Sequence, residues 1–353
     1  MTEILITGGA GFIGSYIAED FASKTKANSI TIIDNLARDK IFHHCSEKEL
    51  DNNLSILKSY GNIRIFKKDL RDYKFIKNLV QETNFDYIFH ASGQTAVSFS
   101  IENPIIDFEH NVRVTMNLLE AIRISNSNPK LFYFSTNKVF GRNVNELEIT
   151  QKETRYVFRD PTFQGISESF PVINTQHSPY GTSKLCSELY IQEYDYTYDI
   201  DYLIIRMSCI YGPRQCGMEA QGWVSHIIKN ALRNEPITIF GDGKQVRDIL
   251  YITDLLKFIE LILKKDVGNE IFNIGGGMNN TISILELIGF LEKILDENII
   301  YAFENWRIAD QKIYVSDISK AIELVGWKPK ISLELGINKM IEWYQDNRNY
   351  LIF

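Results

Sequence analysis

The sequence predicts an α/β protein, with a Rossmann-type, doubly wound parallel sheet and a smaller, interleaved C-terminal lobe. The first observation is that short apolar runs rich in β-branched residues alternate with helical patterns through residues 3–212. Such alternation is typical of a parallel sheet covered by helices on both faces. The second is that the first run leads into a glycine-rich turn, TGGAGFIG at 7–14, which opens a helical pattern. The third is that helices predominate after about residue 211.

Each apolar run in the first part of the chain has the length and the flanking turn residues of a strand. The strands expected from these runs are residues 3–7, 29–34, 63–69, 86–92, 130–136 and 201–212. Helical periodicity between them is clearest at 13–21 and 112–125. We therefore expect one domain of residues 1–211 and about 245–275, and a second lobe of about 212–244 and 276–353. Residues 41–60 form a polar, partly helical segment to which the sequence assigns no role.

Composition argues against several classes of function. The chain has 353 residues and can bury a sizeable core, and its net charge of −7 without a basic stripe argues against nucleic acid as a partner. No apolar run approaches the roughly 18 residues of a membrane span, and the chain enters a strand without room for a signal peptide. We therefore expect a cytoplasmic protein. The cysteines lack CxxC spacing, which predicts free thiols and no metal site: Cys45, Cys186, Cys209 and Cys216.

The glycine-rich turn has the spacing of a dinucleotide-binding site. Gly8, Gly11 and Gly14 allow a tight turn, close approach of the backbone to a pyrophosphate, and a helix N-terminus directed at its charge. Asp34 ends the next strand, twenty residues after Gly14. Its carboxylate suits the two hydroxyls of an adenosine ribose and repels a 2′-phosphate, which favours NAD over NADP, although Arg38 lies close by in sequence. The alternative is that Asp34 only caps a turn.

A tyrosine and a lysine form the expected chemical end of the site. Tyr180 and Lys184, in HSPYGTSK, are four residues apart and would share a helix face. A lysine ammonium one turn away, with an oxidised nicotinamide ring nearby, favours the phenolate, which could take a proton from a sugar hydroxyl while hydride leaves the same carbon for NAD. Thr136, in FSTNKVFG, could hold the same oxygen. Taken alone, the YxxxK spacing is also compatible with a surface tyrosine and a solvated lysine.

The motifs TGGAGFIG, HASGQTAVSFS, FSTNKVFG, SPYGTSK and IYGPRQ occur in this order and together resemble the extended short-chain dehydrogenase/reductase family over nearly the whole chain. The resemblance implies a Rossmann fold and a catalytic trio of Thr136, Tyr180 and Lys184. It also implies a tightly bound NAD. The residues expected at the cofactor are Gly8, Gly11, Phe12, Ile13, Gly14, Asp34, Asn35, Arg38, Asp69, Leu70, Ala91, Ser92, Gly93, Gln94, Asn111, Tyr180 and Lys184.

The residues after Thr136 separate the branches of this family. Dehydratase branches carry an Asp-Glu pair there for acid–base removal of water, whereas this chain has Asn137 and Lys138. The stretches YGPRQCGMEAQGWV, FGDGKQVRD and RIADQKIYVSDI resemble the CDP-sugar 2-epimerase branch. This resemblance implies that Arg247 and Arg307 bind the diphosphate, although Arg307 could instead pair with Asp310. The residues expected at the substrate are Gln94, Asn137, Cys209, Gln221, Gly222, Val224, Ile239, Phe240, Arg247 and Arg307.

These observations predict an NAD-dependent isomerase that inverts C2 of a CDP-linked 3,6-dideoxy sugar through a transient 2-keto intermediate. Such a sugar has no carbonyl beside C2, so oxidation of C2 itself is the available route. A UDP-hexose 4-epimerase on the same scaffold and a non-catalytic NAD-binding regulator are the alternatives. We expect a homo-oligomer, either a dimer or a tetramer. Cys209, Phe140 and Thr136 depart from residues common in the wider family, which leaves the exact sugar open.

Overall fold

The computed structural model describes residues 2–24, 28–37, 47–125, 127–215 and 217–348. Residues 1–136, 179–206 and 266–272 form one compact unit, and 137–178, 207–265 and 273–353 form another. The expected division placed 137–178 and 245–265 with the first domain. The structure groups them with the second unit: Ile166 forms a β-bridge with Ser316, and β11 (Val246–Tyr251) pairs with β9 (Cys209–Tyr211), β13 (Thr281–Ser283) and β15 (Ile313–Tyr314).

The first unit is built on a seven-stranded sheet with the order β12-β8-β5-β4-β1-β2-β3. Four neighbouring pairs, β5-β4, β4-β1, β1-β2 and β2-β3, are parallel. The expected α/β fold with a Rossmann-type sheet is therefore confirmed. The strands are β1 (Thr2–Thr7), β2 (Asn28–Asp34), β3 (Ile63–Lys67), β4 (Tyr87–His90), β5 (Lys130–Thr136), β8 (Tyr202–Met207) and β12 (Glu270–Ile274).

The expectation of a single strand over residues 201–212 was wrong. Residues 201–212 form two strands, β8 and β9, with Ser208 between them. Ser208 donates its backbone N–H to Ile274 O at 2.9 Å and its hydroxyl to Asp248 O at 2.8 Å. These bonds to residues far along the chain turn the backbone, so β9 joins the sheet of the second unit instead of continuing β8.

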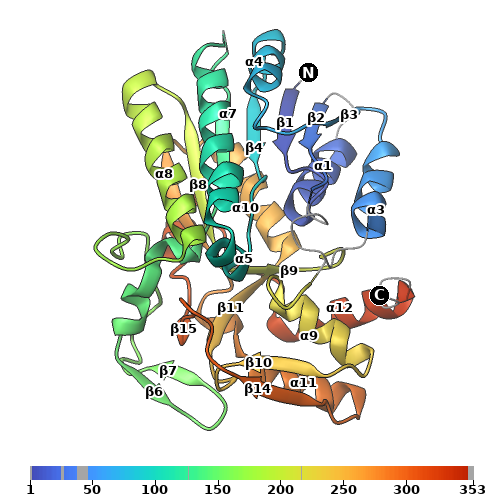
Figure 1. The fold of residues 1–353 in the computed structure, drawn as a ribbon, viewed down its shortest axis with the longest axis vertical. Coiled ribbons are helices and arrows are strands. Elements are labelled where there is room, and N and C mark those ends of the chain that lie inside the picture. The colour runs from blue at the N-terminus through green and yellow to red at the C-terminus, as the bar shows by residue number, and fades with distance from the viewer. Residues whose placement is uncertain (1, 25–27, 38–46, 126, 216, 349–353) are drawn as a thin grey trace. The chain divides into compact units, whose positions relative to one another are not determined.

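Helices flank the parallel sheet, as Figure 1 shows. α7 packs against both α4 and α8, and α1 packs against α3. Alternate strand residues such as Leu5, Ile88 and Leu131 are fully buried beneath the former group, as the period of two along a strand requires. The helices are α1 (Phe12–Lys24), α3 (Glu47–Lys58), α4 (Tyr73–Glu82), α5 (Val97–Glu102), α6 (Pro104–Phe108), the π-helical η1 (Glu109–Arg113), α7 (Val114–Arg123) and α8 (Pro179–Tyr198).

Part of the polar segment 41–60 forms α3, which supports the glycine-rich turn. Leu50 and Leu54 are buried against Ala10. The side-chain amide of Asn53 also donates to Ala10 O at 3.0 Å. This part of the segment therefore has a structural role next to the expected cofactor site, while residues 41–46 lie outside the described residues.

The second unit combines short strands with helices. β10 (Ile237–Phe240) pairs in parallel with β14 (Tyr301–Glu304), and β6 (Ile149–Gln151) pairs antiparallel with β7 (Tyr156–Phe158). A Ser283 capping box begins α11 (Ile284–Leu295). The remaining elements are η2 (Asn137–Glu146), α9 (Trp223–Leu232), α10 (Ile252–Lys265), η3 (Met278–Asn280), η4 (Ala321–Val325) and α12 (Leu333–Asp346).

Two expected absences can be examined over the described ranges. None of the helices described there is long and apolar enough to cross a membrane. The described residues likewise contain no group of three or more histidine, cysteine or acidic side chains arranged to hold a metal ion. Cys186 and Cys209 are free thiols, and Cys45 and Cys216 lie outside the described residues.

Candidate active site

The turn between β1 and α1 leaves no space for side chains. A Cβ on Gly14 would lie 2.3 Å from Gly8 O, and a Cβ on Gly8 would lie 2.7 Å from the Ser92 backbone. Gly8 also has φ +70°, a conformation that favours glycine. Gly11 donates its N–H to Gly8 O at 3.1 Å, and α1 begins at Phe12. The result is a tight turn at a helix N-terminus, where an anion can approach the backbone and is favoured by the helix dipole.

Asp34, at the end of β2, is joined to this turn. Its Oδ2 accepts from Ala10 N at 3.0 Å and its Oδ1 accepts from Leu36 N at 2.9 Å. Asp34 therefore does cap the backbone, as the alternative interpretation held. A carboxylate has further lone pairs, so these bonds leave it able to accept from a ribose hydroxyl as well. Arg38, the neighbouring cation considered in the sequence, lies outside the described residues.

Asp69 and Asn35 form a second polar group beyond β2 and β3. Asn35 Nδ2 donates to Asp69 Oδ2 at 2.9 Å, and Arg71 contacts both oxygens of Asp69 at 3.0 and 2.8 Å. Burial acts to raise the pKa of Asp69, but the bonds from Arg71 and Asn35 prevail and hold that pKa far below its usual value. Asp69 is therefore a fixed anion. Leu70 is buried, and its carbonyl accepts from Asn117 at 2.8 Å.

The residues expected beside the centre of the cofactor converge on a carboxylate that the sequence did not single out. Gln94 Nε2 and Asn111 Nδ2 donate to Asp107 Oδ1 at 2.9 and 3.1 Å. Asn111 also donates to Ser183 Oγ at 3.0 Å. Asp107 is 1% exposed, and burial raises its pKa. Its only local signal was its position four residues before Asn111, on the same helical face.

Residues 91–93 lie against the glycine-rich turn. Ala91 donates its N–H to Thr7 O at 3.1 Å, and the hydroxyls of Thr7 and Ser92 are 3.2 Å apart. A Cβ on Gly93 would lie 2.6 Å from Asn111 Oδ1. The expected cofactor residues at 7–14, 34, 91–94 and 111 are thus brought together in the first unit.

The three residues expected to be catalytic, Thr136, Tyr180 and Lys184, are all buried in the same unit. α8 places Tyr180 and Lys184 on one face, 7% and 4% exposed. This burial contradicts the alternative of a surface tyrosine and a solvated lysine. Thr136 ends β5, and its side chain is hydrogen-bonded to that of Tyr180. Ser100, on α5, accepts the Tyr180 N–H at 3.1 Å and fixes the start of α8.

Burial determines the charges of this group. It lowers the pKa of Lys184 to about 7, although Glu188 and Asp107 act to raise it. Burial also raises the pKa of Tyr180 to about 12, against a lowering effect of the Thr136 bond. The phenolate was expected from Lys184 together with an oxidised nicotinamide ring, and the residues of the chain by themselves leave Tyr180 protonated at neutral pH. A phenolate at neutral pH requires further positive charge beside Tyr180.

In the second unit the two arginines pair differently from the sequence expectation. Arg247 Nη2 donates to Asp310 Oδ1 at 2.7 Å and is 8% exposed. Arg307, which the sequence placed beside Asp310, instead contacts the carbonyl and carboxylate of Glu219, both at 2.9 Å. Its guanidinium carbon also lies 3.8 Å from the centroid of the Phe240 ring. Arg307 is therefore stacked and ion-paired before any ligand binds.

The remaining expected substrate residues of this unit differ in exposure. Val224 and Ile239 are 2% and 1% exposed, so their side chains belong to the core. Cys209 Sγ accepts from Trp223 Nε1 at 3.3 Å. Gln221 exchanges backbone bonds with Met218, and Gly222 precedes α9 with φ +74°. Trp223 therefore supports Cys209 from the start of α9.

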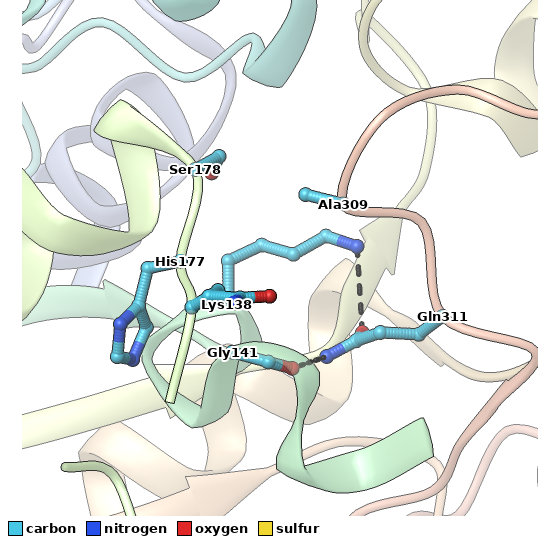
Figure 2. A pocket seen from close by; sticks show the side chains of 7 residues that line it. Lys138, Gly141, His177, Ser178, Ala309 and Gln311 are labelled. Carbon is cyan, nitrogen blue, oxygen red and sulfur yellow. Dashed lines mark hydrogen bonds between the residues drawn. The ribbon is translucent and has the colours of Figure 1, made fainter. Parts of the chain in front are cut away.

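A small pocket opens in the second unit, as Figure 2 shows. The extended Lys138 side chain lies across it and donates to Gln311 Oε1 at 3.3 Å. Burial, followed by the charge of Arg247, lowers the pKa of Lys138 to about 8. Asn137, its neighbour, is 6% exposed. The pocket is lined by Lys138, Gly141, Gln176, His177, Ser178, Ala309 and Gln311.

Comparison with known proteins places the chain among enzymes of nucleotide sugars. A family model described as GDP-mannose 4,6 dehydratase matches residues 5–340. CDP-paratose 2-epimerase of Salmonella typhi is 36% identical over 97% of this chain and 98% of its own length. UDP-glucuronate 4-epimerase of Thermodesulfobacterium geofontis is 31% identical over 98% of this chain and 97% of its own.

A solved structure supports the same relationship. UDP-glucuronic acid 4-epimerase from Bacillus cereus, in complex with UDP-glucuronic acid and NAD, superposes with a TM-score of 0.81. The two sequences are 28% identical, and the alignment covers 98% of this chain and 100% of the other. The similarity therefore extends over both compact units.

Proposed function

Because the chain belongs to the GDP-mannose 4,6-dehydratase family of extended short-chain dehydrogenases/reductases, we propose that it is an NAD-dependent epimerase. Its proposed substrate is a CDP-linked 3,6-dideoxy sugar, which it inverts at C2, as in the conversion of CDP-paratose to CDP-tyvelose. The observation that carries the proposal is the buried group of Thr136, Tyr180 and Lys184. Thr136 is followed in the chain by the amide of Asn137 and the ammonium of Lys138 instead of two carboxylates. The similarity to CDP-paratose 2-epimerase over 97% of the chain supports the choice of substrate.

The residues present fit NAD as the cofactor, as in the related Bacillus cereus structure. A Cβ on Gly8 would collide with the Ser92 backbone and one on Gly14 with Gly8 O, so glycine at both positions permits the tight turn that lets the backbone approach a pyrophosphate. Asp34 would accept from the hydroxyls of the adenosine ribose, and Asn35 with Asp69 would border the adenine. When bound, NAD supplies the hydride acceptor and donor. A reaction without net redox change needs no exchange of cofactor, so we infer that NAD stays bound between turnovers.

The three catalytic residues would divide the proton chemistry. Tyr180 removes the proton of the C2 hydroxyl and later returns it, while Thr136 holds the same oxygen. Lys184 stabilises the phenolate together with the positive nicotinamide ring, since the lysine alone does not lower the pKa of Tyr180 enough. The planar 2-keto sugar then presents its other face to the cofactor, so that hydride returns to C2 while Tyr180 returns the proton to the oxygen, and this completes the inversion. The protein must therefore bind the nucleotide firmly and the sugar loosely.

The charges beside Thr136 argue against dehydration. Loss of water from a keto sugar requires one group to remove a C–H proton and another to protonate the departing hydroxyl. Asn137 has no basic group, and Lys138 is mainly an ammonium below its pKa of about 8. We therefore propose that the 2-keto sugar is reduced again instead of losing water.

A second candidate function is 4-epimerisation of a UDP-hexose. It is favoured by the similarity to UDP-glucuronate 4-epimerase and by the superposition on the Bacillus cereus enzyme. The two candidates require the same Thr136, Tyr180 and Lys184. They differ in the nucleotide and in the carbon that reacts, so substrate experiments separate them.

The proposal is tested by product analysis. Small molecules released from the purified protein are identified by mass spectrometry, and NAD is expected. The protein is then given CDP-paratose or UDP-glucose, and the products are assigned by NMR spectroscopy. Inversion of CDP-paratose at C2 supports the proposal, whereas turnover of UDP-glucose alone supports the second candidate. In heavy water the product should carry no deuterium at C2, because hydride returns to the carbon it left. Stoichiometric deuterium there would contradict the mechanism.

A further inference from the structure

Two buried cations share one carboxylate in the second unit. Arg247 Nη2 lies 2.7 Å from Asp310 Oδ1, and Lys138 Nζ lies 4.0 Å from the same oxygen. The side chains of Arg247, Lys138 and Asp310 are only 9%, 20% and 20% exposed. Positive charges in such surroundings repel each other more strongly than in water. The three groups together carry a net positive charge, so the cluster would be stabilised by an anion.

The ammonium is held in position by its neighbours. Lys138 donates to Gln311 Oε1 at 3.3 Å, and Gln311 Nε2 donates to Gly141 O at 3.2 Å (Figure 2). Gln311 N also donates to Asp310 Oδ1 at 2.9 Å. Asn145 secures the same loop by donating to Asp310 O at 3.1 Å. This arrangement fixes the long lysine side chain before a ligand arrives, which reduces the entropy lost on binding.

The walls of the pocket are also fixed. Gly141 has φ +58°, and a Cβ there would lie 2.7 Å from Gln176 O. His177 Nε2 lies 2.8 Å from Val139 O, which holds the ring against the wall. Ala309 adopts φ +63°, which is unusual for a residue with a side chain. Several close contacts therefore maintain this shape around Lys138.

The chain connects this pocket directly to two catalytic residues. Lys138 follows Thr136 by two residues, and Ser178 precedes Tyr180 by two. Two residues span at most about 7 Å. The backbone of Lys138 therefore lies within about 7 Å of that of Thr136, and the backbone of Ser178 lies within the same span of that of Tyr180.

The distance between the β-phosphate and the reacting group depends on which carbon of the sugar reacts. C2 of a nucleotide sugar is linked to the β-phosphorus only through C1 and the glycosidic oxygen. C4 lies on the opposite side of the sugar ring. When C2 reacts, the β-phosphate must therefore be near the reacting group, and when C4 reacts it must be far away. The Lys138 ammonium, two residues after Thr136, therefore fits a reaction at C2.

We propose that Lys138 binds the β-phosphate of the nucleotide sugar beside Arg247 and so places C2, instead of C4, at Tyr180. This inference rests on the proposed function, because it assigns the contact that selects the carbon. Arg307 is less suited to this place, since its guanidinium is paired with Glu219 and stacked on Phe240. Lysine suits a single phosphate oxygen as a compact charge.

The experiment compares nucleotides with one and two phosphates. CDP and CMP are titrated by calorimetry into the NAD-containing protein and its Lys138→Met variant, which keeps the length of the side chain without its charge. CDP affinity should fall about ten- to hundredfold, the usual effect of a charge-assisted hydrogen bond. CMP affinity should not change. Lys138→Arg should restore most of the CDP affinity, and Lys293→Met on the exposed face of α11 should behave as the wild type.

Each outcome of these titrations supports or overturns the role of Lys138. Unchanged CDP affinity in Lys138→Met, or an equal loss for CMP, would overturn the role of Lys138 at the β-phosphate. If the wild type instead prefers UDP or dTDP, the proposed CDP specificity is wrong. The same comparison of diphosphate and monophosphate, made with the preferred nucleotide, then still tests Lys138. A wild-type protein that binds none of these nucleotides would overturn both proposals.

Discussion

Arg206 and Glu188 form a buried ion pair, with 2.7 Å between Nη2 and Oε2 and exposed fractions of 5% and 0%. Ser135 donates its hydroxyl to the same carboxylate. Glu188 lies one helical turn after Lys184 on α8, and Ser135 immediately precedes Thr136 on β5. The pair, together with Ser135, therefore joins β8, α8 and β5 close to Thr136 and Lys184, two residues of the proposed catalytic group.

Replacing Glu188 with Gln should destabilise the protein strongly. The variant leaves the Arg206 charge buried without its counter-ion, which typically costs about 3–5 kcal/mol. Chemical denaturation, followed by circular dichroism, measures the change. Arg159→Met is the matched control, because the Arg159–Glu148 pair is 70% and 75% exposed and its loss should cost at most about 0.5 kcal/mol. Equal losses in the two variants would contradict the importance of the buried pair.

Gly14→Ala should remove bound NAD. The added Cβ would lie 2.3 Å from Gly8 O and 2.8 Å from Gly9 Cα, so the turn must open where the pyrophosphate is expected. NAD content is measured in the purified variant by absorbance after denaturation. Gly289→Ala is the control: its Cβ meets open space on α11, and alanine should stabilise that helix by about 0.5–1 kcal/mol. A Gly14 variant with full NAD content would show that the turn does not bind the cofactor.

Tyr180→Phe should lose turnover while keeping NAD and nucleotide binding. The ring still fills its buried position in the first turn of α8, but the acid–base group is gone. Loss of such a group commonly reduces the rate by about 10²–10⁴. Steady-state kinetics on CDP-paratose and calorimetry with CDP measure the two properties separately. A variant with more than half the wild-type turnover would mean that another residue transfers the proton.

CDP affinity should decrease with increasing pH in the alkaline range. Burial and Arg247 lower the pKa of Lys138 to about 8, and only its protonated form attracts a phosphate. The attraction is therefore present below about pH 8 and is lost above it, while Asp310 and Cys209, which also face Lys138, oppose the lowering. Calorimetry from about pH 7 to about pH 9.5 follows the change. Lys138→Arg should show a flat profile, because arginine stays protonated; a similar decline in that variant would implicate another group.

Local patterns were sufficient to predict the fold and much of the first unit. β5 begins and ends where its apolar run does, and the i,i+4 spacing of Tyr180 and Lys184 is realised on one face of α8. Both depend on neighbouring residues, since strand and helix periodicity are properties of short segments. The family was predicted from motifs that occur in the family's order along the sequence, and the match of the family model over residues 5–340 confirms it.

The tertiary structure decided which side chains meet and how they are charged. Arg247 reaches Asp310 across 63 positions, and Arg307 reaches Glu219 across 88, whereas sequence proximity had suggested Arg307 with Asp310. The break at Ser208 and the bond from Asn111 to Ser183 likewise involve distant segments. The sequence by itself determined the elements and the reactive residue types, because local sterics and hydrophobic periodicity act within a few residues. Only the folded chain decided the ion pairs and the pKa values of Tyr180, Lys184 and Lys138, because burial and Coulomb interactions depend on distances in space.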